Sequence, residues 1–65
     1  MEVKPVLARL LKERGMTQRE LSEKTGIPEG TISRFDKNDR VVIKYMYLIA
    51  DALDVSIADL VEVRR

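Results

Sequence analysis

The sequence predicts an all-α fold, a compact bundle of five helices. Apolar residues recur at helical spacing near the start of the chain, where Leu7, Leu10 and Leu11 stand at i, i+3 and i+4. Gly15 and Gly26 follow predicted helices, and glycine readily adopts the left-handed conformation that commonly ends a helix. Strand signals are weak, since the VVI run is the one β-branched cluster and is too short to form a sheet alone.

The first two helices are bounded by local signals. The first is predicted over about residues 4–14, with Pro5 in its first turn, where a missing N–H is harmless. The second begins after Thr17, because Thr17 and Glu20 have the T-x-x-E spacing of a capping box, in which each side chain satisfies a backbone N–H at the helix start. Ser22 within this helix is small enough to let another helix cross closely.

The third helix is predicted from Pro28, which suits a first helical turn, to near Asp36. It carries Ile32 and Phe35 three residues apart, so both side chains lie on the face that must point to the core. Asn38 is then well placed for the left-handed position after the helix end.

Two further helices complete the predicted bundle. The fourth is expected over about residues 43–53, with one broad apolar face formed by Tyr45, Leu48, Ile49, Ala52 and Leu53. The fifth starts after Ser56, because Ser56 and Asp59 repeat the capping-box spacing, and it ends near Val61.

Composition bounds the function. The 65 residues, 1–65, are expected to form a single domain around a helix pair at about residues 18–36, and a chain this small buries only about 60% of its unfolded surface. There are no cysteines, and the formal charge of +1 is far from that of a nonspecific nucleic-acid binder. No long apolar run or secretory signal is seen, so we expect a soluble cytoplasmic protein without a membrane partner. The sequence has neither a phosphate-binding glycine loop nor a metal-ligand spacing, so we expect no cofactor and no metal.

The third predicted helix has a polar outer face. At 100° per residue, the side opposite Ile32 and Phe35 carries Gly30, Ser33, Arg34 and Lys37. Arginine can pair in bidentate fashion with guanine, and lysine can contact phosphate. This face therefore suits the major groove of DNA.

The chain resembles the phage lambda and 434 repressor and Cro family. The residues that match the family's helix-turn-helix pattern are Gln18, Leu21, Ser22, Gly26, Ile27, Ile32 and Phe35. The later A-x-x-L-x-V-S ending of the family is matched by Ala50, Leu53, Val55 and Ser56, so the resemblance covers nearly the whole chain.

The resemblance implies contacts with double-stranded DNA. Residues at base-reading positions are Glu29, Gly30, Ser33 and Arg34, and those at positions that contact the DNA backbone are Thr17, Gln18, Lys37 and Lys44. Each of these could instead be a helix cap or a solvated surface residue. Glu29 and Gly30 stand where 434-like proteins have base-reading glutamines. The dipole of the helix explains Glu29 structurally, and Gly30 would allow close approach of the backbone to the groove.

The chain has more apolar residues than a five-helix core of this size can readily bury, which predicts a homodimer interface. This predicted interface consists of Val41, Val42, Ile43, Met46, Tyr47, Val61 and Val63. Ordinary core packing or scattered surface positions are the alternative reading. A dimer fits a two-fold operator whose half-sites lie about 34 Å apart, one turn of DNA.

We therefore expect a sequence-specific DNA-binding regulator, a small repressor that binds a palindromic operator. The alternative is a protein-interaction module of the same fold, antitoxin-like or antirepressor-like, because fold alone does not decide function. An enzyme is disfavoured, since the chain has no histidine and no cysteine.

Overall fold

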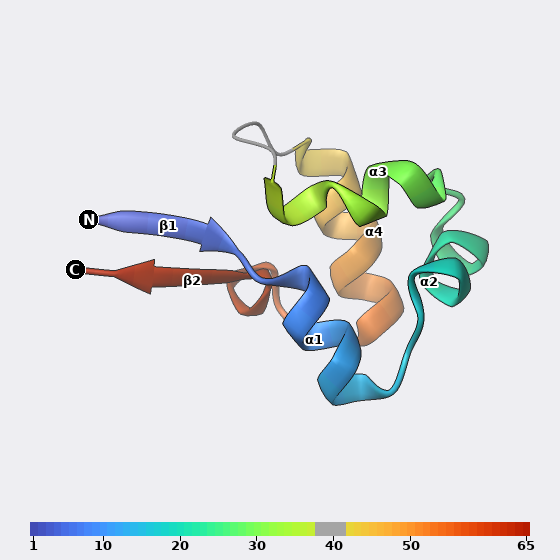
Figure 1. Ribbon diagram of the computed structural model, residues 1–65, viewed down its shortest axis with the longest axis horizontal. Helices are drawn as coiled ribbons and strands as arrows, with labels where there is room; N and C mark the ends of the chain where they lie inside the picture. The colour runs from blue at the N-terminus through green and yellow to red at the C-terminus, as the bar shows by residue number, and fades with distance from the viewer. Residues whose placement is uncertain (38–41) are drawn as a thin grey trace.

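The computed structural model describes residues 1–37 and 42–65, and it combines α-helices with a small sheet formed by the two ends of the chain (Figure 1). In these residues the elements, in order, are β1 (Glu2–Pro5), α1 (Leu7–Arg14), α2 (Gln18–Thr25), α3 (Glu29–Ser33), the 3-10 helix η1 (Phe35–Lys37), α4 (Ile43–Leu53), the 3-10 helix η2 (Ile57–Leu60) and β2 (Val61–Arg64).

The boundaries of α2 and α4 confirm the sequence predictions. Thr17 caps α2 through a hydrogen bond of 3.1 Å from the Glu20 N–H to the Thr17 hydroxyl, and the Glu20 carboxylate accepts from the Thr17 N–H at 3.2 Å. Gly15 and Gly26 follow α1 and α2 with φ values of 65° and 77°, in the left-handed region predicted for them. The helix α4 spans the predicted residues 43–53.

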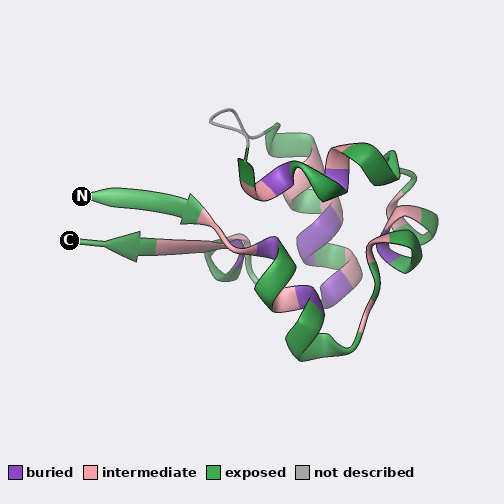
Figure 2. Cartoon of the chain, in the orientation of Figure 1, coloured by how far each residue is buried: buried purple, intermediate pink, exposed green. Residues whose placement is uncertain are grey.

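The core lies where the helices meet (Figure 2). Its buried side chains are Leu7, Leu11, Leu21, Ile27, Ile32, Phe35, Ile49, Ala50, Leu53 and Leu60. Ile32 and Phe35 are 3% and 4% exposed, which confirms that they point inward from the third helical segment. No buried polar or charged residue is found in residues 1–37 and 42–65, so apolar packing supplies the core.

The sheet corrects the predicted first helix. Residues 2–5 form β1 and not a helix, and α1 begins only at Leu7. The residue before a proline is biased away from the α region, so Lys4 and Pro5 suit an extended segment. β1 pairs antiparallel with β2, with Val3 opposite Val63. The all-α prediction was therefore wrong for the two ends of the chain.

The predicted third helix is also shorter than expected. α3 ends at Ser33, Arg34 is a turn, and Phe35–Lys37 form a 3-10 helix. Glycine, serine and β-branched residues are weak helix formers, and α3 contains all of these types. Asp36, in η1, instead accepts hydrogen bonds from the backbone N–H groups of Leu7 (2.8 Å) and Ala8 (2.9 Å) at the start of α1.

The predicted fifth helix is a short 3-10 helix. Ser56 donates its N–H to the Asp59 carboxylate at 3.1 Å, as the capping-box spacing predicts, but η2 ends at Leu60 and Val61 begins β2. A bundle of five α-helices is thus replaced, in the described residues, by four α-helices, two 3-10 helices and a two-stranded sheet. The predictions for Asn38 and Val41 fall outside the described residues.

Candidate DNA interface

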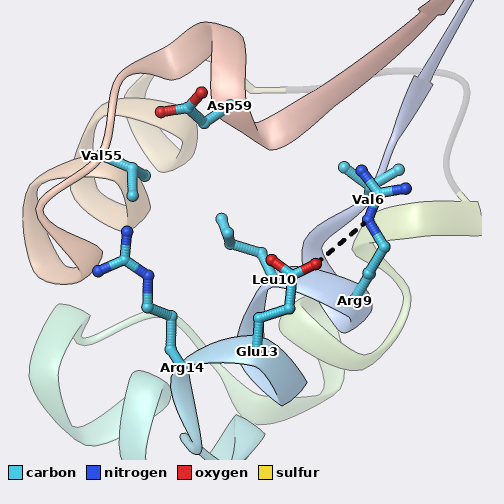
Figure 3. A pocket seen from close by; sticks show the side chains of 7 residues that line it. All are labelled: Val6, Arg9, Leu10, Glu13, Arg14, Val55 and Asp59. Carbon is cyan, nitrogen blue, oxygen red and sulfur yellow. Dashed lines mark ion pairs between the residues drawn. The ribbon is translucent and has the colours of Figure 1, made fainter.

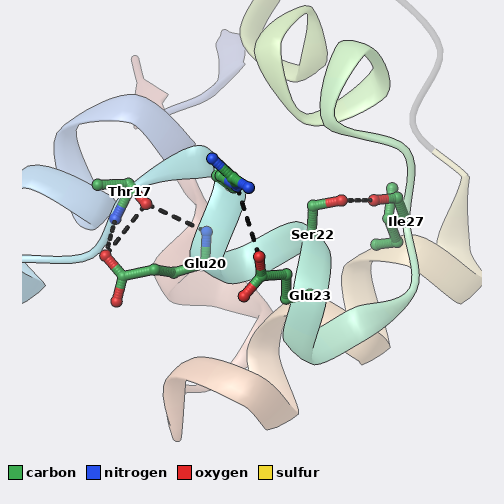
Figure 4. Close-up of polar contacts among 6 residues, drawn as sticks. Thr17, Glu20, Ser22, Glu23 and Ile27 are labelled. Atoms are coloured by element: carbon green, nitrogen blue, oxygen red, sulfur yellow. Dashed lines mark hydrogen bonds and ion pairs between the residues drawn. The ribbon is translucent and has the colours of Figure 1, made fainter.

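The turn between α2 and α3 is held by side-chain hydrogen bonds. The Ser22 hydroxyl donates to the Ile27 carbonyl at 2.6 Å, across the turn (Figure 4). The Thr25 hydroxyl donates to the Leu21 carbonyl at 2.8 Å and accepts from the Ile27 N–H at 3.2 Å. These bonds, with Leu21 and Ile27 buried on the inner side, fix where α3 starts relative to α2.

The start of α2 presents polar groups at the surface. Thr17 is exposed and caps α2. Its hydroxyl also donates to the Glu20 carboxylate at 3.0 Å (Figure 4). Gln18 follows it as the first residue of α2 and is half-buried. The structure therefore supports the capping role of Thr17 directly.

The outer side of α3 carries the residues predicted to read bases. Glu29, Gly30, Ser33 and Arg34 are all exposed, while Ile32 between them is buried. The Arg34 side chain lies back along the helix, because a Cβ added to Gly30 would be 3.8 Å from its Nη2. The Arg34 guanidinium therefore lies within ordinary contact distance of the Gly30 position.

Most cations in residues 1–37 and 42–65 form no ion pair, and Lys4, Lys12, Arg14 and Lys24 are among them. Arg9, Arg19 and Arg64 each form an ion pair with a glutamate, at 3.5 to 3.9 Å. Arg34, Lys37 and Lys44 are exposed, and none has an ion-pair partner within residues 1–37 and 42–65. An unpaired cation can bind phosphate without first losing a carboxylate, so these three suit an anionic partner.

A family model for the Cro/C1-type HTH DNA-binding domain matches residues 6–64. The chain belongs to the Cro/C1-type helix-turn-helix DNA-binding domain family. This is a family of DNA-binding domains and not of enzymes. The match begins after β1 and takes in both helices of the α2–α3 pair, so the predicted XRE-like family is confirmed.

Solved structures of similar shape support the assignment of this Cro/C1-type domain. One is a Bacteroides fragilis protein described as a candidate DNA-binding protein, with a TM-score of 0.80 and 27% identity over 94% of this chain and 100% of that chain. Another is the N-terminal DNA-binding domain of SinR from Bacillus subtilis, with a TM-score of 0.74 and 27% identity over 83% of this chain and 81% of that chain. No curated protein matches the sequence.

The residues predicted for a dimer interface lie in two places on this Cro/C1-type domain. Val42, Ile43 and Tyr47 are exposed at the start of α4, where Met46 is half-buried against the core. A shallow groove of about 470 Å³ beside Tyr47 is lined by Lys44, Tyr47, Leu48 and Asp51. Val61 is half-buried and Val63 exposed in β2. Val41 lies outside the described residues.

A separate surface hollow lies between α1 and η2 (Figure 3). It measures about 330 Å³ and is lined by Val6, Arg9, Leu10, Glu13, Arg14, Val55 and Asp59. Arg9 pairs with Glu13 at 3.9 Å, and Asp59 is used as a helix cap. None of its lining residues belongs to α2 or α3, the helix pair predicted to contact DNA.

Residues 1–37 and 42–65 contain no group of three or more acidic, histidine or cysteine residues that could hold a metal ion. They also contain no helix that is long and apolar enough to cross a membrane.

Sequence reasoning missed two residues that position the interface. Ser22 was predicted to matter for its small size, whereas its hydroxyl also joins α2 to Ile27 in the turn before α3. Sequence reasoning also placed Asp36 at a helix end, whereas its carboxylate binds the start of α1. A serine hydroxyl four to five residues before an apolar position is a weak signal, and the contact of Asp36 is between residues far apart in the chain.

Proposed function

We propose that this protein is a sequence-specific transcriptional regulator, a cytoplasmic repressor that binds a palindromic operator as a homodimer. The observation that carries the proposal is the outer side of α3, where Arg34 is exposed, unpaired within the described residues and folded over Gly30. Behind this surface, the turn bonds of Ser22 and Thr25 and the buried Ile32 hold the helix in place.

In this proposal α3 lies in the major groove and α2 crosses the DNA backbone. Arg34 reads a guanine through the two acceptors on its major-groove edge, and Ser33 contacts a neighbouring base. Glu29 accepts from a cytosine amino group or remains a favourable charge at the helix start. Gly30 lets the backbone of α3 approach the bases.

The flanking residues bind the DNA backbone without reading sequence. Gln18 and the N–H groups beside Thr17 contact one phosphate at the start of α2. Lys37 in η1 and Lys44 in α4 contact phosphates on either side of the reading helix. Occupancy of the operator then blocks transcription.

A homodimer extends the recognised sequence. One short helix reads few base pairs, whereas two copies about 34 Å apart read both halves of a palindrome. The exposed apolar residues at the start of α4 and in β2 are the surfaces available for the contact between copies.

A second candidate is a protein-interaction module on the same fold, antitoxin-like or antirepressor-like. It is favoured by the near-neutral charge of +1 and by the exposure of Ile43 (68%) and Tyr47 (63%) beside the proposed phosphate contact Lys44. An apolar surface of this kind suits a protein partner.

A selection from random double-stranded DNA separates the two candidates. The regulator is expected to recover a palindromic consensus, and its affinity is expected to fall steeply as salt rises, because phosphate contacts release counterions. Failure to recover a palindrome, or an affinity that ignores salt, would favour the interaction module. The matched control is Arg34→Ala, which should lose preference at one position in each half-site while the salt dependence persists.

A further inference from the structure

The surface hollow between α1 and η2 combines apolar walls with charges of both signs (Figure 3). Its volume of about 330 Å³ lies at the lower end of the range of about 300–1,000 Å³ that is usual for ligand pockets. The apolar part of the lining consists of three half-buried residues, Val6, Leu10 and Val55. A site of this size suits a small molecule and not a macromolecule.

Two of the four charged residues around the hollow already bind each other. Arg9 Nε lies 3.9 Å from a carboxylate oxygen of Glu13, and Arg9 Nη1 lies 3.8 Å from Glu62 in β2. Figure 3 shows the Glu13 carboxylate turned toward Arg9. A ligand would have to break these contacts to use either residue, so Arg9 and Glu13 form the rim of the hollow and not its binding groups.

Arg14 and Asp59 are the two charges that remain available. Both are exposed, and neither forms an ion pair with any residue in 1–37 and 42–65, although both line the same hollow. Asp59 Oδ2 accepts from the Ser56 N–H at 3.1 Å, while Oδ1 has no hydrogen-bond donor within those residues. The hollow therefore offers a guanidinium from the end of α1 and a carboxylate oxygen from η2.

These groups define the chemistry of a matching ligand. A guanidinium binds a carboxylate through paired N–H bonds, and a carboxylate oxygen accepts from an ammonium group. Leu10 and Val55 pack against the core and present apolar surface to the hollow, which favours a ligand with a short apolar side chain. A dicarboxylate would be repelled by Asp59 and a diamine by Arg14, so the pair selects a molecule that carries one charge of each sign.

We propose that this hollow binds a free α-amino acid with a branched apolar side chain. The ligand carboxylate binds the Arg14 guanidinium, its ammonium group donates to Asp59 Oδ1, and its side chain lies against Leu10 and Val55. The ligand thus joins α1 to η2, and it stabilises the folded chain because the unfolded chain has no such site. This binding is separate from the proposed contacts with DNA, which lie on other elements.

The test is a titration of the full 65-residue, isotope-labelled chain, followed by NMR. Leucine is expected to bind with a dissociation constant of about 1 mM or lower, with the signals of the hollow's lining residues moving most. Three analogues each lack one element of the ligand: leucinamide the carboxylate, isocaproate the ammonium group and glycine the side chain. Each should bind at least about threefold more weakly, since contacts between exposed charges are modest.

Two variants assign the charges, and a third is the control. Arg14→Gln should bind leucine and leucinamide alike, and Asp59→Asn, whose amide oxygen can still accept from Ser56, should bind leucine and isocaproate alike. Lys12→Gln removes an exposed cation of α1 that does not line the hollow, so it should bind leucine as wild type does. A cooperative melt of each variant establishes that it folds.

Three results would overturn the proposal. They are a leucine titration of wild type that does not saturate by about 20 mM, discrimination that survives both Arg14→Gln and Asp59→Asn, and an equal loss of affinity in Lys12→Gln. Recovery of a DNA consensus by a chain that binds no leucine would still support the regulator, so the two proposals fail separately.

Discussion

The carboxylate of Asp36 caps α1 at Leu7, with 2.8 Å between Oδ1 and the Leu7 nitrogen. Oδ2 accepts from Ala8 at 2.9 Å in the same way. Val6, the residue before α1, has no side-chain cap of its own. Because Asp36 follows α3 closely, this contact ties the end of the reading segment to the first helix of the core.

Loss of this cap should destabilise the fold. We expect Asp36→Ala to lower the free energy of unfolding by about 0.5–2 kcal/mol, the usual range for a helix cap, and Asp36→Asn to fall between it and wild type. Urea denaturation measures the change. Asp51→Ala removes the same charge from an exposed position on α4 and should have little effect. Equal stability of Asp36→Ala and wild type would mean that water replaces the cap at no cost.

Ser22→Ala tests the hydrogen bond that holds the turn between α2 and α3. Removing the hydroxyl leaves the Ile27 carbonyl without its 2.6 Å partner, so we expect a loss of about 0.5–1.5 kcal/mol in stability. DNA affinity should fall as well, because one of the hydrogen bonds that hold the start of α3 against α2 is lost. Ser33→Ala, at an exposed position, should leave the melting temperature unchanged. The assignment is wrong if the two alanine variants melt alike.

Arg34→Ala should act on specificity. We expect a loss of about 1–3 kcal/mol of discrimination at one position of each half-site, because a bidentate contact with guanine is removed. Competition between the selected site and its single-base variants measures this. Tight and selective binding by Arg34→Ala would exclude Arg34 as a base-reading residue.

Lys37→Ala provides the contrast, because a phosphate contact carries no sequence information. Its affinity should fall for all sequences alike, and the slope of log affinity against log salt should decrease by about 1. Gln18→Ala should likewise weaken binding to all sequences. A change in preferred sequence for either variant would contradict the assignment to the backbone.

Gly30→Ala separates folding from binding. The glycine has an ordinary helical conformation, and an added Cβ would meet the Arg34 guanidinium at 3.8 Å, which is normal contact. We expect a gain of about 0.5–1 kcal/mol in stability with a loss of DNA affinity, since the methyl group stands between the backbone and the groove. Gly15→Ala, at a φ of 65°, should destabilise the fold instead. Unchanged affinity of Gly30→Ala would show that close approach is not needed.

Local capping signals made α2 predictable, and the helical spacing of apolar residues made α4 predictable. The capping box of Thr17 and Glu20 and the left-handed Gly26 depend on residues a few positions apart, and the inward Ile32 and Phe35 follow from helical spacing. Helical spacing also predicts which residues lie on the outer side of α3. Exposure of Arg34 and Lys37 is in agreement with that assignment, and their contacts with DNA stay predictions.

The sheet was missed because its signal is not local. Val3 and Val63 pair although nearly the whole chain separates them in sequence. Each strand is too short to give a recognisable strand pattern by itself. Pro5 is compatible with a first helical turn as well as with a strand end. The pairing of β1 with β2 places it at the end of a strand. The hydrogen bond by which Asp36 caps α1 at Leu7 was not predicted for the same reason, since it joins residues that only the folded chain brings together.

The pairing of Val3 with Val63 also sets an order of events in folding. Closing a loop that contains almost the entire chain is entropically costly, so the helices are expected to form before the sheet of β1 and β2 does. The edge of β2 comes into being only with that last step.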